Sequence, residues 1–266
     1  MSTSDAVHVE TQGSVYTVIL DRPDRRNAID PRTAGDLADA FRAFEADDGA
    51  SVAVLYGDGG HFCAGADLKA LADGDVHTVD PDPATDGPLG CTRMKLSKPV
   101  IAAVEGYAVA GGLELACWCD LRIVAEDAIF GVFCRRVGVP LVDGGTQRLP
   151  KIVGLGRALD LILTGRQVSA SEAHAMGLAT RVVPSGSARD EAESLALSLA
   201  SMPQACMRSD RRAVYEGLGL SERAGLAREA ELGRQVLDSG EPLEGAERFA
   251  RRRRAAREAG ASEEQD

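Results

Sequence analysis

Strand-like and helix-like segments alternate through most of the chain and then give way to helical segments alone. Residues 15–20, 51–56 and 99–104 are short apolar runs rich in β-branched side chains, which are typical of buried strands. A helical pattern follows each run, and the first helix has Asp30 at its N-cap and Pro31 at its first position. This alternation restricts the chain to an α/β core in which helices pack on a sheet.

The alternation ends with one more helix and one more strand. Ser169-x-x-Glu172 is a capping box that opens a short helix, and residues 179–183 form the last predicted strand. Every periodic segment beyond that strand is helical. We therefore predict two domains, an α/β core over residues 1–200 and a helical region over residues 201–266.

Charge and apolar patterning argue against two classes of partner. The net charge is −11, whereas nucleic-acid binding requires a positive face. No apolar run reaches the roughly 18 to 20 residues of a membrane span, and no basic segment leads into an apolar stretch at the N-terminus. We expect a cytoplasmic protein that binds no nucleic acid, no membrane and no metal, with its six cysteines as free thiols. The basic run at residues 251–254, with Arg257, is predicted to be a solvated helix face, or alternatively an anion contact.

An acidic segment separates the second and third predicted strands. Residues 73–87 contain Pro81 and Pro83 and few apolar side chains. Such a composition buries little apolar surface and disfavours regular secondary structure. A mobile loop is therefore predicted here.

Two glycine-containing segments carry the candidate chemistry. Residues 61–68 read His-Phe-Cys-Ala-Gly-Ala-Asp-Leu and residues 108–116 read Ala-Val-Ala-Gly-Gly-Leu-Glu-Leu-Ala, and both follow a predicted strand. The second segment also opens a helix, so the N–H of Gly111 lies unpaired at a positive helix end, where negative charge is favoured. It would be half of an oxyanion hole. By local signal alone, a Gly-Gly pair before a helix is more often a tight turn, and Ala-Gly-Ala-Asp is more often a loop with an Asp N-cap.

These segments, with the strand between them, resemble the crotonase (enoyl-CoA hydratase/isomerase) family. Its pattern has a Phe-x-Ala-Gly-x-Asp loop, a Lys-Pro-Val-Ile-Ala-Ala-Val strand and a Gly-Gly-x-Glu-Leu-Ala helix start, found here at residues 62–67, 98–104 and 111–116. The likeness extends from Asp21-Arg22-Pro23 to the Gly-Gly-Thr-Gln-Arg-Leu-Pro run at residues 144–150, and it continues at residues 163–165, 173–178 and 182–183. The resemblance implies an α/β fold, a crotonase-type spiral of ββα units, with a helical C-terminal oligomerisation region. It also implies a homotrimer or a dimer of trimers.

The same resemblance assigns the reacting groups. The backbone N–H groups of Ala66 and Gly111 are expected to bind the thioester oxygen of an acyl-CoA substrate, where enolate charge accumulates. Glu114, in the first turn of the helix, matches a catalytic glutamate of the family's hydratases. Coenzyme A is then part of the substrate, and no separate cofactor is expected.

Further residues are expected at the coenzyme A moiety by the same resemblance. Arg25 and Arg26 suit phosphate contacts. The terminal helix of the family reaches a neighbouring subunit's coenzyme A, although Arg257 stands here in place of an aromatic residue. The full set of expected contacts is Arg25, Arg26, Ala28, Ala64, Asp67, Leu68, Cys134 and Arg252.

One position departs from the hydratase pattern. The family's second glutamate falls in register with Cys134, and a thiol with a pKa near 8.5 is a poor substitute for a carboxylate that activates water. Cys134 is expected to line the pocket instead. Asp143 is a candidate replacement acid, or alternatively an Asx turn former before Gly144-Gly145. Arg135 and Arg136 are candidates to pair with that acid or to bind a polar acyl group.

Three functions remain open from the sequence. The first is hydration of a 2-enoyl-CoA, as part of fatty acid metabolism, with Glu114 handling both water and proton. The second is enolate chemistry without water, such as double-bond isomerisation, with Glu114 and Asp143 moving a proton. The third is binding of acyl-CoA or RNA without turnover.

Overall fold

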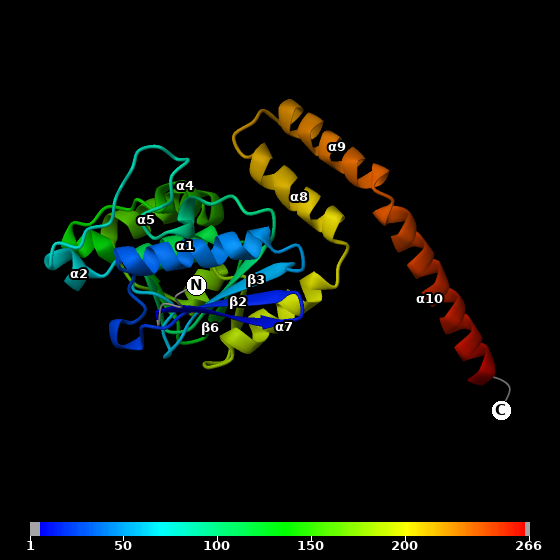
Figure 1. Ribbon diagram of the computed structural model, residues 1–266, viewed down its shortest axis with the longest axis horizontal. Coiled ribbons are helices and arrows are strands. Elements are labelled where there is room, and N and C mark those ends of the chain that lie inside the picture. The colour runs from blue at the N-terminus through cyan, green and yellow to red at the C-terminus, as the bar shows by residue number, and fades with distance from the viewer. Residues whose placement is uncertain (1–5, 264–266) are drawn as a thin grey trace. The chain divides into compact units, whose positions relative to one another are not determined.

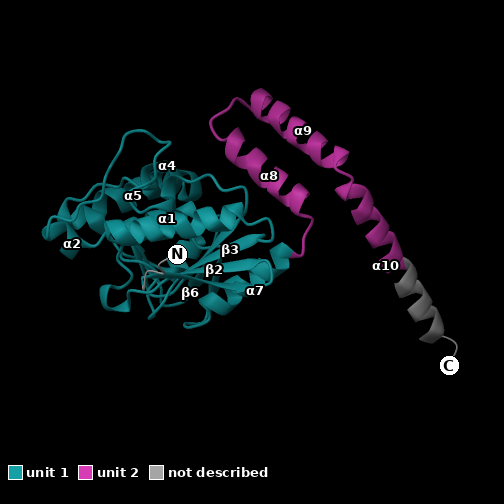
Figure 2. Cartoon of the chain, in the orientation of Figure 1, with its two compact units in different colours: residues 1–200 teal, residues 201–266 magenta. Residues whose placement is uncertain are grey.

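The computed structural model describes the backbone of residues 6–263 and the side chains through residue 253. The chain divides into two compact units, residues 1–200 and residues 201–266 (Figure 2). Each unit has its own secondary structure and is described by itself. Among the described residues, no helix combines the length and the apolar character needed to cross a membrane.

A six-stranded sheet forms the centre of the first unit (Figure 1). Its order is β1 (Val7–Gln12), β2 (Val15–Leu20), β3 (Val52–Gly57), β4 (Val100–Val104), β6 (Leu121–Ala125) and β9 (Arg181–Val183). β1 pairs antiparallel with β2, and every other neighbouring pair is parallel. The sequence pattern missed β1, because most of this edge strand is exposed and polar.

Three short strands form a second, smaller sheet. It joins β5 (Tyr107–Val109), β7 (Ile129–Gly131) and β8 (Val168–Ser169), with β5 parallel and β8 antiparallel to β7. Each strand has at most three residues, which is too short to give a recognisable alternation in the sequence. β5 leads directly into the glycine segment that begins at Ala110.

Alternate side chains of the central strands belong to two apolar clusters, as the two-residue period of a strand requires. Ala53 and Leu55 belong to the main core, together with Leu37, Phe41 and Phe44 of α1 (Pro31–Ala46). The alternating neighbours Val52 and Val54 pack in a second cluster with Ala192 and Ala196 of α7 (Ala188–Ala200). The sheet is therefore covered on both faces.

The predicted helix signals are present. The Asp30 side chain accepts a hydrogen bond from the Thr33 N–H at 2.8 Å and caps α1. Ser169 accepts from the Glu172 N–H at 3.3 Å, so the capping box opens α6 (Ala170–Ala175). The other elements of this unit are η1 (Pro23–Arg25), α2 (Leu68–Ala72), η2 (Cys91–Arg93), α3 (Gly111–Trp118), η3 (Phe133–Val137), α4 (Gly145–Val153) and α5 (Leu155–Thr164).

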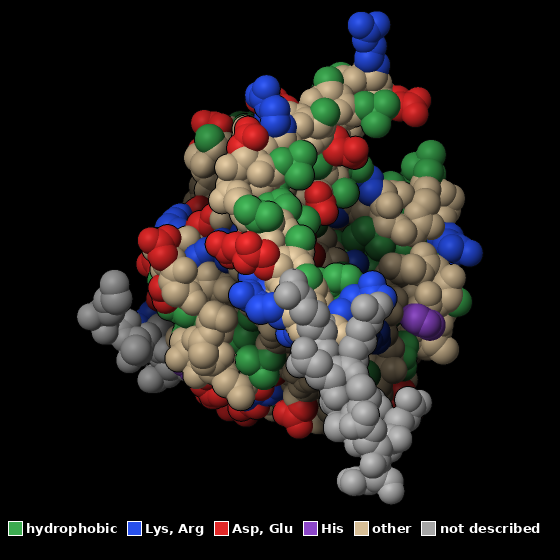
Figure 3. Space-filling view, turned by 90° about the vertical axis from the view of Figure 1, so that its right-hand side faces the viewer, with side chains coloured by type: hydrophobic (Ala, Val, Ile, Leu, Met, Phe, Trp, Pro, Cys, Tyr) green, Lys and Arg blue, Asp and Glu red, His purple; other side chains and the backbone are tan. Residues whose placement is uncertain are grey.

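The second unit consists of α8 (Gln204–Gly217), α9 (Glu222–Asp238) and α10 (Glu241–Glu263). Glu241 links the start of α10 to the start of α8, since its carboxylate accepts from the N–H groups of Ala205 and Cys206 at 3.1 and 2.8 Å. Arg252 is exposed on α10, whereas the Arg257 side chain lies outside the described residues. On the face drawn in Figure 3, acidic and basic side chains are interspersed, as on an ordinary solvated surface.

All six cysteines are free thiols, as predicted. Five are buried and Cys206 is exposed. Residues 73–87 begin in the turn that follows α2 and contain no helix or strand. Their mobility stays a prediction.

Candidate active site

The loop after β3 presents the backbone N–H of Ala66. Its neighbours on both sides bond to Ile29, because the Ile29 N–H donates to the Gly65 oxygen and the Asp67 N–H donates to the Ile29 oxygen, each at 2.8 Å. In the described part of the chain the Ala66 N–H itself has no acceptor. Pairing of this kind fixes the direction of a donor while leaving it free.

The second donor is the N–H of Gly111 at the first position of α3. Ala110, which precedes it, has a φ of 54° and a ψ of −125°, an unfavourable backbone conformation for a residue with a Cβ atom. The Ala110 N–H donates to the Gly131 oxygen at 2.8 Å, so the neighbouring strand β7 supports this turn. The Gly111 N–H has no acceptor among the described residues, since the first helical positions have no partner within the helix.

The two loops touch at their glycines. A Cβ atom placed on Gly65 would lie 2.6 Å from the Gly111 nitrogen, and one on Gly111 would lie 3.6 Å from the Ala66 nitrogen. The structure therefore brings together the two N–H groups that the sequence predicts for an oxyanion hole. Two free donors at one point suit an oxygen atom that gains negative charge.

Glu114 follows one turn later on α3 and is 2% exposed. Its Oε1 atom accepts from the N–H groups of Asp143 and Gly145 at 3.0 and 2.8 Å. Burial, together with the charge of Asp143, raises the pKa of Glu114 to about 7, and the two hydrogen bonds oppose this only in part. A carboxylate with this pKa exchanges protons readily at neutral pH.

Asp143 is also buried, and it contacts a different loop rather than its own turn. Its Oδ1 atom accepts from the Leu89 N–H at 2.9 Å and from the Thr92 hydroxyl at 2.5 Å. Burial raises the pKa of Asp143, and the Thr92 hydrogen bond acts in the opposite direction. Arg148 binds the Asp143 and Thr92 carbonyl oxygens at 2.8 and 2.5 Å, so it holds this segment to η2.

The two acids and the two residues with free N–H groups line one cavity of about 440 Å³. Apart from the reacting groups, its wall is mainly aliphatic, as suits a substrate with a hydrocarbon part. The predicted site residues that line it are Ala64, Ala66, Leu68, Gly111, Glu114, Cys134 and Asp143. Cys134 is 6% exposed, and burial raises the pKa of its thiol, which keeps it neutral.

Within the first unit, four of the predicted coenzyme A contacts do not line this cavity, namely Arg25, Arg26, Ala28 and Asp67. Arg25 and Arg26 are exposed, and the Arg26 guanidinium lies 5.2 Å from the centre of the Tyr107 ring. Ala28 is buried. Asp67 is 5% exposed, and its carboxylate caps α2 through the Lys69 and Ala70 N–H groups. Asp67 therefore has structural partners on both oxygens.

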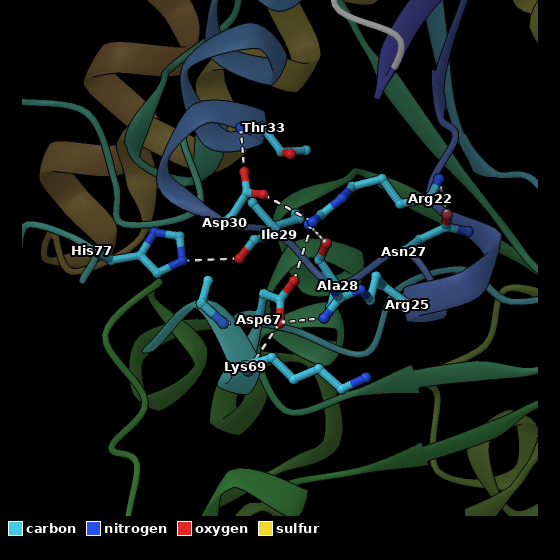
Figure 4. Close-up of polar contacts among 11 residues, drawn as sticks. Arg22, Arg25, Asn27, Ala28, Ile29, Asp30, Thr33, Asp67, Lys69 and His77 are labelled. Atoms are coloured by element: carbon cyan, nitrogen blue, oxygen red, sulfur yellow. Dashed lines mark hydrogen bonds and ion pairs between the residues drawn. The ribbon is translucent and has the colours of Figure 1, made fainter. Parts of the chain in front are cut away.

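Arg22, which had no predicted role, contacts residues 28–30 and Asp67 (Figure 4). Its Nη2 atom lies 2.8 Å from the Asp30 carboxylate and 3.1 Å from the Asp67 carboxylate, and its Nη1 atom donates to the Ala28 oxygen. Arg22 thus ties residues 28–30 to the loop that ends at Asp67. The Asp21-Arg22-Pro23 run was noted, but a single arginine gives no signal for contacts with three later residues in two segments.

His77 was also missed, because it lies in the acidic segment without regular structure. It lines the cavity, and its Nε2 atom donates to the Ile29 oxygen at 2.9 Å (Figure 4). That oxygen also accepts the Asp67 N–H. Through Ile29, His77 therefore joins residues 73–87 to the donor loop.

We expect Arg22→Gln to lower the free energy of unfolding by about 3 kcal/mol, because it leaves the buried Asp67 carboxylate short of its main partner. Arg25→Gln is the matched control. Arg25 is 40% exposed and lies 3.7 Å from the same carboxylate, so its loss is expected to cost below about 1 kcal/mol. Urea unfolding of the two variants checks this. Equal losses would show that Arg22 has no special role.

The α/β core and its cavity are those of a crotonase-fold enzyme. The sequence model of the family described as enoyl-CoA hydratase/isomerase matches residues 10–258. The chain belongs to the enoyl-CoA hydratase/isomerase family, which confirms the resemblance found in the sequence and the predicted fold class.

Individual relatives match over nearly the whole chain. A carnitinyl-CoA dehydratase of Proteus mirabilis is 38% identical over 260 residues, which cover 94% of this chain and 97% of that protein. A carnitinyl-CoA dehydratase of Salmonella paratyphi A is 36% identical over 260 residues, which again cover 94% of this chain and 97% of that protein. The crystal structure of an enoyl-CoA hydratase from Mycobacterium marinum is 36% identical with a TM-score of 0.87, covering 94% of this chain and 97% of that one.

Proposed function

We propose that the protein catalyses the reversible addition of water to a 2-enoyl-CoA thioester, with Glu114 as its acid-base group. One observation carries the proposal. The buried Glu114 carboxylate, whose pKa is raised to about 7, lies in the same apolar cavity as two free backbone N–H groups. The names of the relatives, hydratases and dehydratases of CoA thioesters, describe the same reaction in its two directions.

In this mechanism the thioester oxygen accepts hydrogen bonds from the N–H groups of Ala66 and Gly111. Ionised Glu114 takes a proton from water while the hydroxide bonds to C3, and the electrons of the C2–C3 double bond move to the thioester oxygen. The enolate then takes the proton from Glu114 at C2, which restores the carbonyl and the carboxylate. The two donors stabilise the charge on oxygen, worth about 3 kcal/mol of barrier for each donor.

Double-bond isomerisation is the second candidate, and Asp143 is the observation that favours it. Asp143 lines the same cavity with a raised pKa, whereas Cys134 occupies the position of the second hydratase glutamate. In this alternative one carboxylate removes a proton from C2 of a 3-enoyl-CoA and the other returns a proton at C4. No water is added.

Purified protein with crotonyl-CoA tests the proposal, by following loss of the conjugated enoyl absorbance. Asp143→Asn keeps an oxygen for Leu89 and Thr92, so we expect it to retain hydration within about tenfold of the parent. The contrary result is turnover of a 3-enoyl-CoA that needs both acids, with no hydration of crotonyl-CoA. That result would make the protein an isomerase.

The pH profile of kcat/KM separates one reacting acid from two. If Glu114 acts alone it must start ionised in either direction, so the rate is expected to fall about tenfold per pH unit below pH 7 and to level off above it. Hydration and dehydration should give the same ascending limb. A bell-shaped profile would instead show that a second group, protonated at the start, takes part.

We further propose that coenzyme A is bound as part of the substrate and that no separate cofactor takes part. The exposed guanidinium groups of Arg25, Arg26 and Arg252 are available to its phosphates.

Large apolar side chains are exposed on the second unit, including Val214, Leu226, Leu237, Leu243 and Phe249. They support assembly as a homotrimer or dimer of trimers, because exposed apolar surface of this kind favours association.

A further inference from the structure

Arg136 is a cation on the wall of the cavity that the proposed reaction does not use. It lies in η3, two residues after Cys134. The lining residues that can carry charge are His77, Glu114, Arg136 and Asp143. Among these described residues Arg136 alone is permanently positive, because a guanidinium does not lose its proton in proteins.

The guanidinium of Arg136 is held in place but not neutralised. Its Nε and Nη2 atoms donate to the Gly165 oxygen at 3.0 and 2.7 Å, and its Cζ atom lies 3.8 Å from the centre of the Phe133 ring. The remaining hydrogens on Nη1 and Nη2 find no acceptor within the described part of the chain, and no described carboxylate is within 4.0 Å. These donors are free for an anion.

Apart from Arg136, His77 and the two reacting acids, Glu114 and Asp143, the described residues of the wall carry no charge. Along the chain from Arg136 to Asp143 the lining residues are aliphatic, and they include Val137, Val139 and Pro140. Phe133 has the one benzene ring on the described lining, and the Arg136 guanidinium already lies over its face. A quaternary ammonium group would therefore find no free aromatic face, which is its usual partner.

We propose that the preferred acyl group ends in a carboxylate and that Arg136 binds this carboxylate. The inference rests on the proposed function in taking an acyl-CoA as ligand, and it deepens that function by naming the charge of the acyl group. The thioester end lies at Ala66 and Gly111, and the hydrocarbon part follows the aliphatic wall. The carboxylate stays apart from Glu114 and Asp143, where like charge would repel it.

Coenzyme A brings anions of its own, so the test must separate an acyl carboxylate from a phosphate. Saturated thioesters serve as probes: glutaryl-CoA is matched with pentanoyl-CoA, and adipoyl-CoA with hexanoyl-CoA. Each pair has the same number of carbons and differs only by a carboxylate in place of a methyl group. Their dissociation constants are measured by calorimetry on the full chain.

Arg135 supplies the matched control. It is also exposed on η3 and donates to a single backbone oxygen, that of Ile162 at 3.2 Å, but it does not line the cavity. We expect the parent and Arg135→Gln to bind at least one dicarboxylic member about tenfold or more tightly than its methyl partner. Arg136→Gln is expected to remove that preference while binding the methyl partner unchanged.

Two outcomes would overturn the inference. Equal weakening of both members of a pair by Arg136→Gln would place Arg136 at a coenzyme A phosphate, and absence of any preference in the parent protein would show that no carboxylate is recognised. Because the probes have no C2–C3 double bond, binding is measured whether or not the protein hydrates an enoyl-CoA. If the protein keeps the preference for the dicarboxylic member but does not convert crotonyl-CoA, the proposed hydration is wrong and the proposed carboxylate site still holds.

Discussion

Glu114→Gln is expected to lower kcat for hydration of crotonyl-CoA by about 10³-fold with a small change in KM. The glutamine side chain has the same shape, and its oxygen can still accept from the Asp143 and Gly145 N–H groups that now bind Oε1. The substitution therefore removes the proton-transfer group and leaves the cavity intact. Stopped-flow or steady-state absorbance measurements give both constants.

A stability measurement on the same variant provides its control. Glutamine does not ionise, so Glu114→Gln should be as stable as the parent below pH 4.5, where both states of the parent hold the proton, and more stable at pH 8, where the parent must bury a charge. A large loss of activity without any gain in melting temperature at pH 8 would contradict the account of Glu114 as an ionised buried base. Retained activity would remove Glu114 from the mechanism.

The second large effect is expected from Gly65→Ala. Gly65 has a φ of +89°, and its new methyl group would lie 2.6 Å from the Gly111 nitrogen. The two donor loops must then separate, which misaligns both N–H groups and should lower kcat about 10²- to 10³-fold. KM should change less, because the donors act mainly on the charge that develops during reaction.

Gly186→Ala separates backbone strain from this displacement. Gly186 has a φ of +83°, and a Cβ atom there would have no neighbour within 4 Å. Both substitutions carry the penalty of about 1 to 2 kcal/mol for a left-handed backbone, but only Gly65→Ala disturbs the donors. Comparable losses of kcat in the two variants would show that strain alone explains the effect.

The sequence predicted those parts of the fold that have a local signal. The caps at Asp30 and Ser169 and the apolar runs of β2, β3 and β4 are confirmed, because each depends on neighbouring residues. β1 escaped prediction, since an exposed edge strand lacks a hydrophobic pattern. The short strands β5, β7 and β8 are specified by tertiary pairing rather than by their own residues.

The same distinction holds for the site, where features with a local sequence signal were predicted and contacts between distant segments were not. The helix end that carries Gly111 is visible in a linear sequence, whereas the resemblance to the crotonase family assigned Ala66 and Glu114 to the reaction. The side chains that support the site were not visible, since Arg22, His77 and Arg148 contact residues distant in the chain. Assignment of Asp67 to coenzyme A followed the family pattern, whereas its oxygens are occupied by Arg22 and by the cap of α2.

Burial of Glu114 also sets how many protons the chain binds as it folds. The carboxyl group has a pKa of 4.5 in an unfolded chain and about 7 in the folded one. Below pH 4.5 both states hold the proton, and between pH 4.5 and 7 the unfolded state loses it first, so stability falls as the pH rises through this window. Near pH 6 folding must therefore draw a proton from the solvent at Glu114, and the heat of refolding should vary with the ionisation enthalpy of the buffer.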